Sequence, residues 1–466
     1  MHVLLHKAFG KRLQLALVLG LIMALVLSAC APSGADDPVE SDDTEATPTT
    51  EAPAATDDES DAEEPEESPD ATEDDSTSGE PIVVKVGFLS PVTGPLAAIG
   101  TEMKQGWELY WEEHGAEAGN YVVETIYEDD AGNPDTALTK ARRLVEDEQV
   151  DVVVGPLAAN TALAVADYLI QQGVPNFHPV TAADDLTQRL ANPLVIRVGA
   201  MTGSQATYVA GHWAYEQGYR KAITLCSDYA FGWENCGGFV RTFTEAGGEI
   251  VDQLWNPLGT PDFSSYATQI ASSGADVAFI GSSGGTDGTN FMRAYEDFGL
   301  GDTIDVLGNC CLLDQATLRD VGDLALGLRS VTYWAEGRES PEVERFLELY
   351  DETYGGIASL YVANSYTAAH VFSEALKSMD GEIDPEGLVA AAREVNLEDS
   401  VFGPRRIDEY NNPVGNVYIT RVEQREDGLY WNVPEETFEE VSQFWTYDPE
   451  EILNSPPYDR TNTGQQ

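Results

Sequence analysis

From Pro81 onward the sequence alternates between short, β-branched apolar segments and longer segments whose apolar residues recur at helical spacing. Residues 82–90 predict a buried strand, and residues 96–115 predict a helix that stops at a glycine. Such a series predicts parallel sheets with helices on both faces, because parallel strands connect through right-handed helical crossovers. The series runs to residue 173 and restarts at residue 221. The chain is therefore predicted to be an α/β protein with two doubly wound lobes.

The last part of the sequence also contains helix and strand patterns, but they alternate less regularly. Residues 340–355 and 364–379 have apolar residues at helical spacing and predict two further helices. Residues 416–422 are rich in β-branched residues and predict strands shorter than the earlier ones. We expect this part to complete the two lobes.

In open α/β sheets the ligand lies beyond the carboxyl ends of the strands, in the loops that lead into the helices. These loops are rich in Gly, Ser and Thr, which also serve tight strand-to-helix turns, so no single one of them is evidence of ligand contact. They contain no Gly-rich phosphate-binding motif and no metal-ligand spacing, so no cofactor and no metal ion is predicted. The loops are residues 90–100, 155–162, 177–186, 227–234, 281–288 and 308–314.

One of these loops contains a sequence pattern that is also found in hydrolases. Residues 281–285 read Gly-Ser-Ser-Gly-Gly, which matches the Gly-x-Ser-x-Gly pattern of a nucleophile elbow between a strand and a helix. A hydrolase also needs a later histidine, and only His370 follows, on a predicted helix. The motif is evidence of a hydrolase only when the acid, the histidine and the oxyanion-hole groups are also present, so we expect no enzyme. A Ser283-dependent hydrolase stays as the alternative.

The N-terminus predicts export. Lys7, Lys11 and Arg12 precede an apolar run over residues 13–27, which is too short to span a bilayer comfortably. The following Leu-Ser-Ala-Cys ending resembles the lipobox of bacterial lipoproteins, in which the cysteine takes a diacylglyceryl group. The resemblance implies a signal peptide over residues 1–29 and a lipid anchor on Cys30 at the outer face of the cell membrane. A short transmembrane anchor is the alternative.

The segment after Cys30 has the composition of a tether. Residues 31–80 contain no Lys, no Arg and no aromatic residue, and Asp and Glu fill about two fifths of the positions. A segment with low hydrophobicity and one sign of charge cannot bury enough apolar surface to offset the ordering of its backbone. Residues 30–80 are therefore predicted to be the lipidated cysteine and a disordered acidic tether that holds the folded part off the membrane.

The charge of the chain excludes one class of partner. Its 466 residues include 81 Asp and Glu against 25 Lys and Arg, for a net charge of −56. Nucleic acid is not an expected partner, because neutralising phosphates needs Lys and Arg. About 385 residues follow the leader and tether, which is enough for two domains.

Four cysteines lie in the predicted second lobe, and outside the cytoplasm they can form disulfides. Cys226 ends a predicted strand and Cys236 lies in the helix that follows, so a bridge between them is geometrically possible. Cys310 and Cys311 are adjacent, and a bridge between them would close a strained eight-membered ring. Either of these two could instead reach Cys226 or Cys236, or all four could be free. We expect at least one disulfide.

Four segments together resemble the branched-chain amino acid (Leu/Ile/Val-binding) family of solute-binding lipoproteins of ABC transporters, which have the periplasmic binding protein type I fold. Each segment alone is weakly specific, but their order and spacing agree with the family from about residue 82 to residue 447. The segments are residues 84–109, 152–187, 227–234 and 256–285.

The resemblance implies two Rossmann-like lobes joined by three crossings of the chain, with the ligand in the cleft between them. The implied crossings are residues 198–202, 331–334 and 403–406. The implied parts are a first lobe of residues 82–199 and 334–403, a second lobe of residues 200–333 and 404–447, and a C-terminal extension of residues 448–466. It also implies a monomer that captures a small solute and delivers it to a membrane permease of an ABC importer. A ligand sensor for a membrane signalling protein is a further alternative.

The sequence departs from the family pattern at the expected ligand contacts. Asn160 and Thr161 stand where the family presents a pair of serines, and Ile99 replaces an aromatic residue. No acid lies near residues 308–311 to receive an ammonium group, which argues against an α-amino acid. The expected solute is a branched-chain amino acid or a related small compound of amide, urea or aromatic acid type, because the fold alone does not decide between them. His178 is expected to be structural. The expected contacts are Asn160, Thr161, Thr181, Tyr229, Phe231, Ser282, Ser283 and Cys310.

Overall fold

The computed structural model describes residues 80–398 and 400–465. The predicted signal peptide, Cys30 and nearly all of the predicted tether lie outside the described residues. The described residues belong to one compact unit. No helix among the described residues has both the length and the apolar character needed to cross a membrane.

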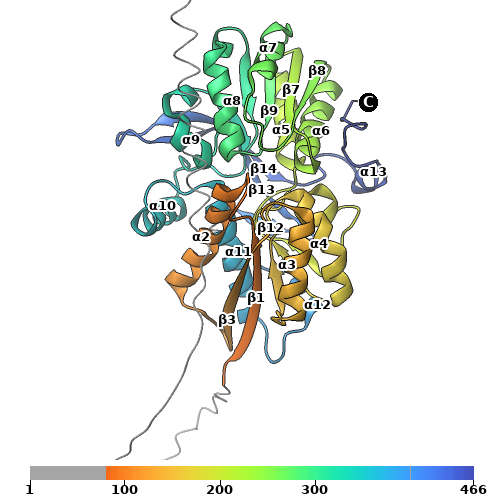
Figure 1. Cartoon of the computed structure of the whole chain (residues 1–466), viewed down its shortest axis with the longest axis vertical. Helices are drawn as coiled ribbons and strands as arrows, with labels where there is room; N and C mark the ends of the chain where they lie inside the picture. The colour runs from red at the N-terminus through yellow and green to blue at the C-terminus, as the bar shows by residue number, and fades with distance from the viewer. Residues whose placement is uncertain (1–79, 399, 466) are drawn as a thin grey trace, which may run out of the picture. The chain divides into compact units, whose positions relative to one another are not determined.

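The first lobe is built on a sheet of six strands (Figure 1). Its strands run in the order β2-β3-β1-β4-β5-β6, and all neighbours are parallel except the β2–β3 pair. The central strand β1 pairs along its whole length with β3, and its second half, from Val86 to Ser90, is buried on both faces. The strands are β1 (Ile82–Ser90), β2 (Glu117–Ala118), β3 (Tyr121–Asp129), β4 (Val152–Val154), β5 (Asn176–His178) and β6 (Val195–Arg197).

The second lobe is built on a sheet of eight strands. Its parallel part has the order β8-β7-β9-β10-β11, and an antiparallel group of β13, β12 and β14 continues it beyond β11. The strands are β7 (Lys221–Ser227), β8 (Glu249–Asn256), β9 (Val277–Gly281), β10 (Asp305–Gly308), β11 (Arg329–Thr332), β12 (Arg405–Ile407), β13 (Pro413–Gln424) and β14 (Tyr430–Val441). The prediction of shorter strands near residues 416–422 is wrong, because β13 and β14 have 12 residues each.

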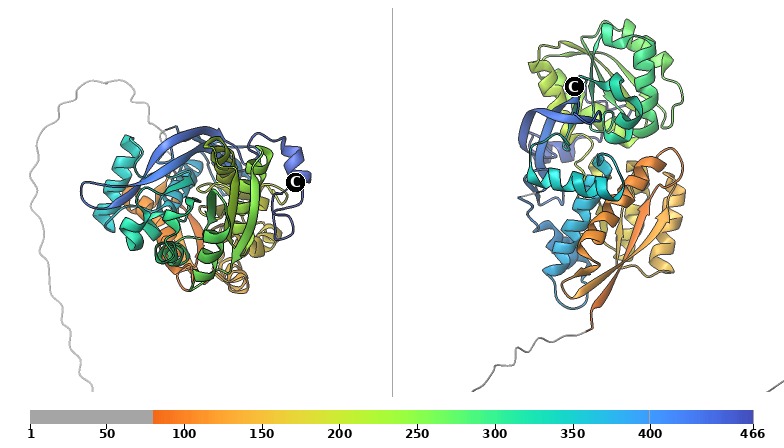
Figure 2. Two further views of the ribbon diagram at one scale, coloured as in Figure 1. Left: turned by 90° about the horizontal axis from the view of Figure 1, so that it is seen from above. Right: turned by 90° about the vertical axis from the view of Figure 1, so that its left-hand side faces the viewer.

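Helices cover both sheets (Figures 1 and 2). Several begin with a capping side chain followed by proline, such as Asn133 before α3, Ser340 before α10 and Asp384 before α12. The first lobe has α2 (Ala97–His114), α3 (Pro134–Glu146), α4 (Ala159–Gln172), α10 (Pro341–Thr353), α11 (Leu360–Lys377) and α12 (Pro385–Arg393). The second lobe has α5 (Gln205–Glu216), α6 (Ala230–Glu245), α7 (Ser264–Ser272), α8 (Gly285–Asp297) and α9 (Gln315–Val321).

The helices α2 and α11 lie side by side although they are far apart in the sequence (Figure 1). Their close approach depends on Gly106, where an added Cβ atom would lie 2.2 Å from the backbone oxygen of Val362. The Trp107 ring next to it is buried between Phe88 of β1 and Phe372 of α11, at centroid distances of 5.7 and 5.8 Å. This aromatic packing joins the sheet of the first lobe to the helix that returns from the second lobe.

The chain passes between the two sheets three times, in the segments 198–204, 333–340 and 394–404. The buried Arg405 guanidinium donates to the backbone oxygen of Gly199 and lies over the Phe402 ring, 4.2 Å from its centroid. The Tyr418 hydroxyl of β13 donates to the Phe402 oxygen over 2.9 Å. These contacts join the first crossing, the third crossing and the second sheet.

The C-terminal extension is attached to both lobes. It includes the helix α13 (Pro449–Asn454), whose Ile452 side chain is buried. Arg189, which follows β5, donates to the backbone oxygens of Ser455 and Ile452 over 2.9 and 3.1 Å. Arg460 forms an ion pair of 2.9 Å with Asp228 of the second lobe. The segment after residue 448 is therefore packed against the body over most of its length.

Candidate ligand-binding pocket

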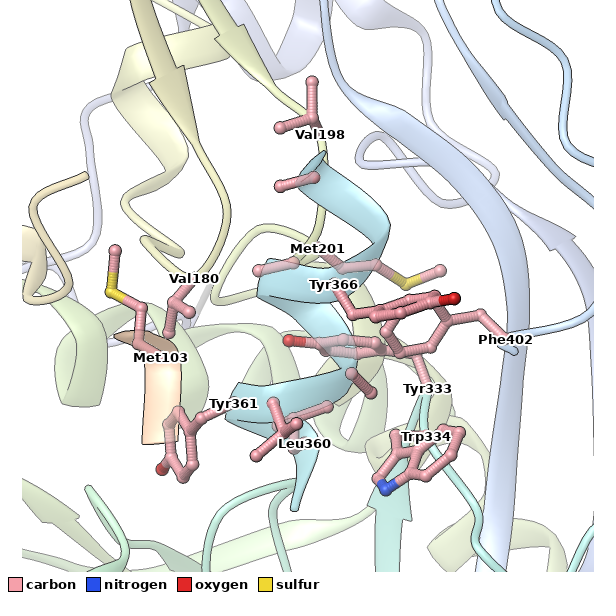
Figure 3. Packing of buried hydrophobic residues seen from close by; sticks show 14 of the residues in the cluster. Met103, Val180, Val198, Met201, Tyr333, Trp334, Leu360, Tyr361, Tyr366 and Phe402 are labelled. Atoms are coloured by element: carbon pink, nitrogen blue, oxygen red, sulfur yellow. The ribbon is translucent and has the colours of Figure 1, made fainter. Parts of the chain in front are cut away.

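A pocket lies where the carboxyl ends of the two sheets face each other. It contains about 630 Å³ of space not filled by protein atoms, its opening to solvent included. Three sets of residues line it, and five of them are labelled in Figure 3.

We define the first-lobe wall as Leu96, Ile99, Leu157, Ala158, Ala159, Val180, Ala182, Leu360 and Tyr361. The second-lobe wall is Tyr229, Phe231, Asn235, Ser283, Cys310 and Cys311. Between the walls lie Met201, Thr202, Gly203, Ala206, Thr207 and Tyr333, which belong to the crossings and the first turn of α5. None of these lining residues, all within the described part of the chain, is Asp, Glu, Lys, Arg or His.

The first-lobe wall is aliphatic except for Tyr361, and its polar character comes from the backbone. The helix α4 begins at this wall with Ala158 as its N-cap, and no side chain caps it. The first N–H groups of a helix have no partner within the helix and carry a partial positive charge. The first turn of α4 therefore offers backbone donors at an apolar surface, an arrangement that suits an anion.

The structure does not bring the predicted contacts of the first lobe into the pocket lining. The Thr161 hydroxyl donates to the Ala158 oxygen over 2.8 Å, and the Thr181 hydroxyl donates to the Pro156 oxygen. Both threonines are fully buried, and their hydroxyls bind backbone beside the wall. Asn160 lies in the first turn of α4 with its amide oxygen buried and unpartnered. The neighbouring alanines and Val180 face the pocket in their place.

The second-lobe wall contains a chain of hydroxyl groups. The Tyr229 hydroxyl shares a hydrogen bond of 3.1 Å with the Ser283 hydroxyl, which donates to the Ser227 hydroxyl over 2.9 Å. Tyr361 reaches across from the other wall, and its hydroxyl donates to the Ser283 backbone oxygen over 3.3 Å. Burial raises the pKa of Tyr229, which keeps this phenol protonated and able to donate.

Four of the predicted contacts line the pocket: Tyr229, Phe231, Ser283 and Cys310. The predicted Ser282 does not, because its hydroxyl accepts the Gly284 N–H over 3.0 Å within the loop. Whether any of these residues touches a solute stays a prediction.

The surroundings of Ser283 bear on the hydrolase alternative. Its hydroxyl partners are two other hydroxyls, those of Ser227 and Tyr229. His370 lies on α11, where its ring stacks on the Tyr110 ring at a centroid distance of 5.7 Å. His178 is fully buried, and burial lowers its pKa to about 3, so its ring is neutral at ordinary pH. Neither histidine lines the pocket or pairs with Ser283 in the described structure.

One acid close to the lining lies behind Gly203. A Cβ atom added to this glycine would lie 2.7 Å from a carboxylate oxygen of Glu234 on α6. The other carboxylate oxygen of Glu234 accepts the Asp184 N–H over 3.0 Å. Burial raises the pKa of Glu234 well above its usual range, which favours the neutral acid. Glu234 is thus close to the pocket but does not line it.

The turn with Cys310 and Cys311 is held by Asn309, which is fully buried. Its amide oxygen accepts the N–H groups of Cys311 and Leu312 over 3.3 and 3.1 Å. Its amide nitrogen donates to Asn235 of α6 over 2.9 Å. Cys236, the next residue, forms a disulfide with Cys226 of β7, one of the pairings that the sequence left open.

Sequence reasoning missed most of the first-lobe wall and the residues between the walls. A usable signal existed for Met201, Thr202 and Gly203, since a predicted crossing borders the cleft. Figure 3 shows Met201 and Tyr333 on one side of α11 and Val180 on the other. No such signal marked Leu360 and Tyr361, which reach the pocket because α11 begins there. Within the described residues, no group of three or more His, Cys, Asp or Glu side chains is placed to hold a metal ion.

Comparison with known proteins identifies the family. The family model for periplasmic binding proteins matches residues 83–428. This chain belongs to that family. Leu/Ile/Val-binding protein homolog 6 of Brucella melitensis is 32% identical over 362 residues, which cover 77% of this chain and 92% of the relative.

Solved structures of similar periplasmic binding proteins agree. A solute-binding protein of an ABC transporter from Rhodopseudomonas palustris BisB5, in complex with 3,4-dihydroxybenzoic acid, has 30% identity and a TM-score of 0.74, covering 78% of this chain and 98% of that one. A second, from strain HaA2 in complex with p-hydroxybenzoic acid, has 28% identity and a TM-score of 0.73, with the same coverage. A substrate-binding protein from Sphaerobacter thermophilus has 33% identity and a TM-score of 0.73, covering 78% and 99%.

These comparisons confirm the predicted family and the predicted fold class of two α/β lobes. They also confirm the predicted function at the level of a solute-binding protein of an ABC transporter. Membership implies a location outside the cytoplasm, a small-molecule ligand and a permease partner. The predicted residue borders of the lobes stay a prediction.

Proposed function

We propose that this periplasmic binding protein captures small aromatic carboxylates and delivers them to an ABC permease. The observation that carries the proposal is the uncharged pocket, which combines the uncapped first turn of α4 with an otherwise apolar first-lobe wall. A carboxylate fits the backbone donors of a helix N-terminus. A flat ring fits the apolar remainder of the pocket, since apolar contact supplies most of the affinity in such sites.

An α-amino acid fits the same pocket less well. Its ammonium group needs an anionic or carbonyl partner when it leaves water, because an unpaired buried charge is costly. No carboxylate lines the pocket in the described residues, and the nearby Glu234 favours its neutral form. Two similar solute-binding proteins from Rhodopseudomonas palustris were solved with hydroxylated benzoic acids, which supports the same class of solute here.

The hydroxyl chain of Tyr229 and Ser283 suggests a preference within this class. A ring hydroxyl that reaches these groups gains hydrogen bonds that benzoate cannot make. The solute would then lie with its carboxylate toward α4 and its ring hydroxyl toward the second-lobe wall.

We also propose the anchor, the oligomeric state and the lobe borders that the sequence predicts. The chain is anchored through a lipid on Cys30, acts as a monomer and performs no catalysis. Its first lobe consists of residues 82–199 and 334–403, and its second lobe of residues 200–333 and 404–447. Replacing Cys30 with Ala should release the protein from membranes and abolish its labelling with fatty acid, and retention of both would contradict the anchor.

Ligand titration of the purified full chain tests the solute class. Benzoate, 4-hydroxybenzoate and 3,4-dihydroxybenzoate should raise the melting temperature and bind with measurable heat, because a ligand of the native state stabilises it by ~2.7 kcal/mol at a hundredfold excess over Kd. Benzamide, which lacks the charge, and leucine should bind at least about tenfold more weakly, the factor that about 1.4 kcal/mol represents. Binding of leucine without binding of any benzoate would contradict the proposal. Turnover of an ester that disappears in Ser283→Ala would favour the hydrolase instead.

A further inference from the structure

Cys310 and Cys311 bring their sulfur atoms together at the surface of the pocket. The two Sγ atoms lie 3.3 Å apart, and both residues line the pocket. Successive side chains in an extended segment point to opposite sides. Here the turn held by Asn309 places both side chains on the same side instead.

The surroundings keep the two cysteines in this arrangement. Gly284 packs directly beneath Cys311, since an added Cβ atom would lie 2.9 Å from the Cys311 backbone oxygen. Asn309 is tied to Asn235, and the neighbouring Cys236 is tied to β7 by the disulfide with Cys226. These contacts fix the backbone of the turn that carries the two thiols.

We propose that Cys310 and Cys311 form a reversible vicinal disulfide that serves as part of the second-lobe wall. In the oxidising compartment that membership of the family implies, the pair reacts with the disulfide of an oxidant protein by thiol–disulfide exchange. One S–S bond forms between the two residues, and the S–S bond of the oxidant breaks. Two electrons and two protons pass to the oxidant, which leaves as a dithiol.

The vicinal bond differs from the Cys226–Cys236 bond in how far a reductant can reach it and in the distance between the Cα atoms that it joins. Cys226 and Cys236 are fully buried, whereas Cys310 is half-buried and faces the pocket. Adjacent Cα atoms lie about 3.8 Å apart, below the range of about 4.4–6.8 Å that is usual for disulfides, and such departures make a bond easier to reduce. A mild reductant should therefore open the vicinal bond first.

The reduced pair reacts slowly at neutral pH. Its hydrogen bond with Cys311, and then burial, raise the pKa of the Cys310 thiol well above its usual range. The attacking species in exchange is the thiolate, so reoxidation should speed up as the pH rises. The reduced pair is also a dithiol that a trivalent arsenical can bridge.

The redox state should change the pocket. The disulfide offers a compact apolar surface, whereas the dithiol presents two S–H groups to the same space. The expected effect of the redox state on solute affinity rests on the proposed function, whereas the expected thiol chemistry does not depend on it. Two kinds of readout keep the two proposals separate.

The first readout is the state of the cysteines in the full chain exported by its host. The protein is alkylated in denaturant without reductant, and the peptide with residues 310 and 311 is analysed by mass spectrometry. We expect an unalkylated peptide that has lost two hydrogens, and we expect dithiothreitol to make it alkylatable before Cys226 and Cys236. Two alkylated cysteines in the exported protein, together with no bond formation when a separate unalkylated sample is treated with oxidised glutathione at pH 8.5, would overturn the proposal.

The second readout uses phenylarsine oxide, in which arsenic forms a bond to each sulfur while its oxygen leaves as water with the two thiol protons. Mildly reduced protein should bind one equivalent, and both the oxidised protein and Cys310→Ser should bind none. Cys310→Ser replaces the half-buried cysteine of the pair and leaves the buried Cys311 in place. An unchanged melting curve shows that this variant folds. Equal labelling of the oxidised and reduced chains would overturn the proposal. Equal binding of 4-hydroxybenzoate in the two redox states would contradict the part of the disulfide in the second-lobe wall, whereas no binding in either state would contradict only the proposed solute.

Discussion

The two walls of the pocket are built in different ways. The first-lobe wall is aliphatic apart from Tyr361, and its polar groups belong to the backbone at the start of α4. The second-lobe wall carries hydroxyl, amide, aromatic and sulfur groups, held by hydrogen bonds between side chains and by a disulfide. In the proposed binding mode, the first wall holds the carboxylate of the solute and the second wall provides groups that can distinguish one ring from another.

Because the two walls are built differently, we expect the first-lobe wall to set the affinity for all solutes and the second-lobe wall to set the selectivity among them. Backbone donors remain when one side chain replaces another, except with proline, so filling its space is the direct way to alter the first-lobe wall. The second-lobe wall can be altered one polar group at a time. Changes on the first wall should weaken all solutes together, and changes on the second should reorder them.

Removing the disulfide beneath the second-lobe wall should have the largest effect. Cys226→Ala with Cys236→Ala should lower the free energy of unfolding by about 2–3 kcal/mol, since the bond closes a short loop of the chain. Urea unfolding without reductant measures the loss. The same substitutions at Cys310 and Cys311 are the matched control and should cost less, because an adjacent pair encloses no loop. Equal losses in the two double variants would contradict this contrast.

Filling the first-lobe wall should come next. Ala158→Leu places a larger side chain in the pocket at the start of α4 and should weaken every benzoate, at a cost of about 1–3 kcal/mol or roughly tenfold to a hundredfold in Kd. Ala164→Leu makes the same change on the same helix away from the pocket lining and should leave Kd unchanged. Calorimetric titration compares the two variants, and equal effects would show that this wall does not face the solute.

Removing one hydroxyl from the second-lobe wall should change the order of solutes. Tyr229→Phe deletes the group that shares a hydrogen bond with Ser283 and should weaken 4-hydroxybenzoate about tenfold, the value of one hydrogen bond of ~1.4 kcal/mol. Benzoate should bind as before, since it has no ring hydroxyl. A uniform loss for both solutes would mean that the ring hydroxyl lies elsewhere.

The last prediction concerns the pH dependence of stability through Asp314, which joins the two walls. Its carboxylate caps α9 and accepts the N–H of Leu360 over 2.7 Å. Burial, and then the charge of Glu102, raise the pKa of Asp314 to about 7. Between pH 4 and pH 7 the unfolded state is ionised while the folded state keeps its proton, so stability should fall as the pH rises through this window.

Asp314→Asn should flatten this part of the pH profile, measured by urea unfolding between pH 4 and pH 8. Asp276 is the matched comparison, because its carboxylate accepts the N–H groups of Arg220 and Lys221, both over 2.8 Å, and these bonds lower its pKa. Its contribution is present at neutral pH and is lost as the pH falls, which is the opposite sign. A profile that Asp314→Asn leaves unchanged would contradict the assignment.

The sequence predicted the regular elements well because strands and helices have a period. The alternation after Pro81 predicted two doubly wound lobes, and the family comparison and the two sheets agree. The length of β13 and β14 escaped prediction, since a long antiparallel hairpin at the edge of a parallel sheet has no helical segments to mark its strands. One of its pairing partners, β11, also lies far away in the sequence.

The pocket was predictable only in part, because loops have no period that tells which side chain faces inward. Four of the five contacts predicted for the second lobe line the pocket, and none of the three predicted for the first lobe does. At Thr161 and Thr181 a backbone oxygen near in space competes for the hydroxyl, which turns the polar side chain away from the pocket. Small neighbours such as Ala158 and Ala182 are left to face it.

A crystal structure of the full chain with 4-hydroxybenzoate tests the central claim most directly. The account predicts the carboxylate within hydrogen-bonding distance of the first N–H groups of α4, and the ring hydroxyl beside Tyr229 and Ser283. A carboxylate bound at the hydroxyl chain of the second-lobe wall, or a ligand bound outside the pocket, would contradict it.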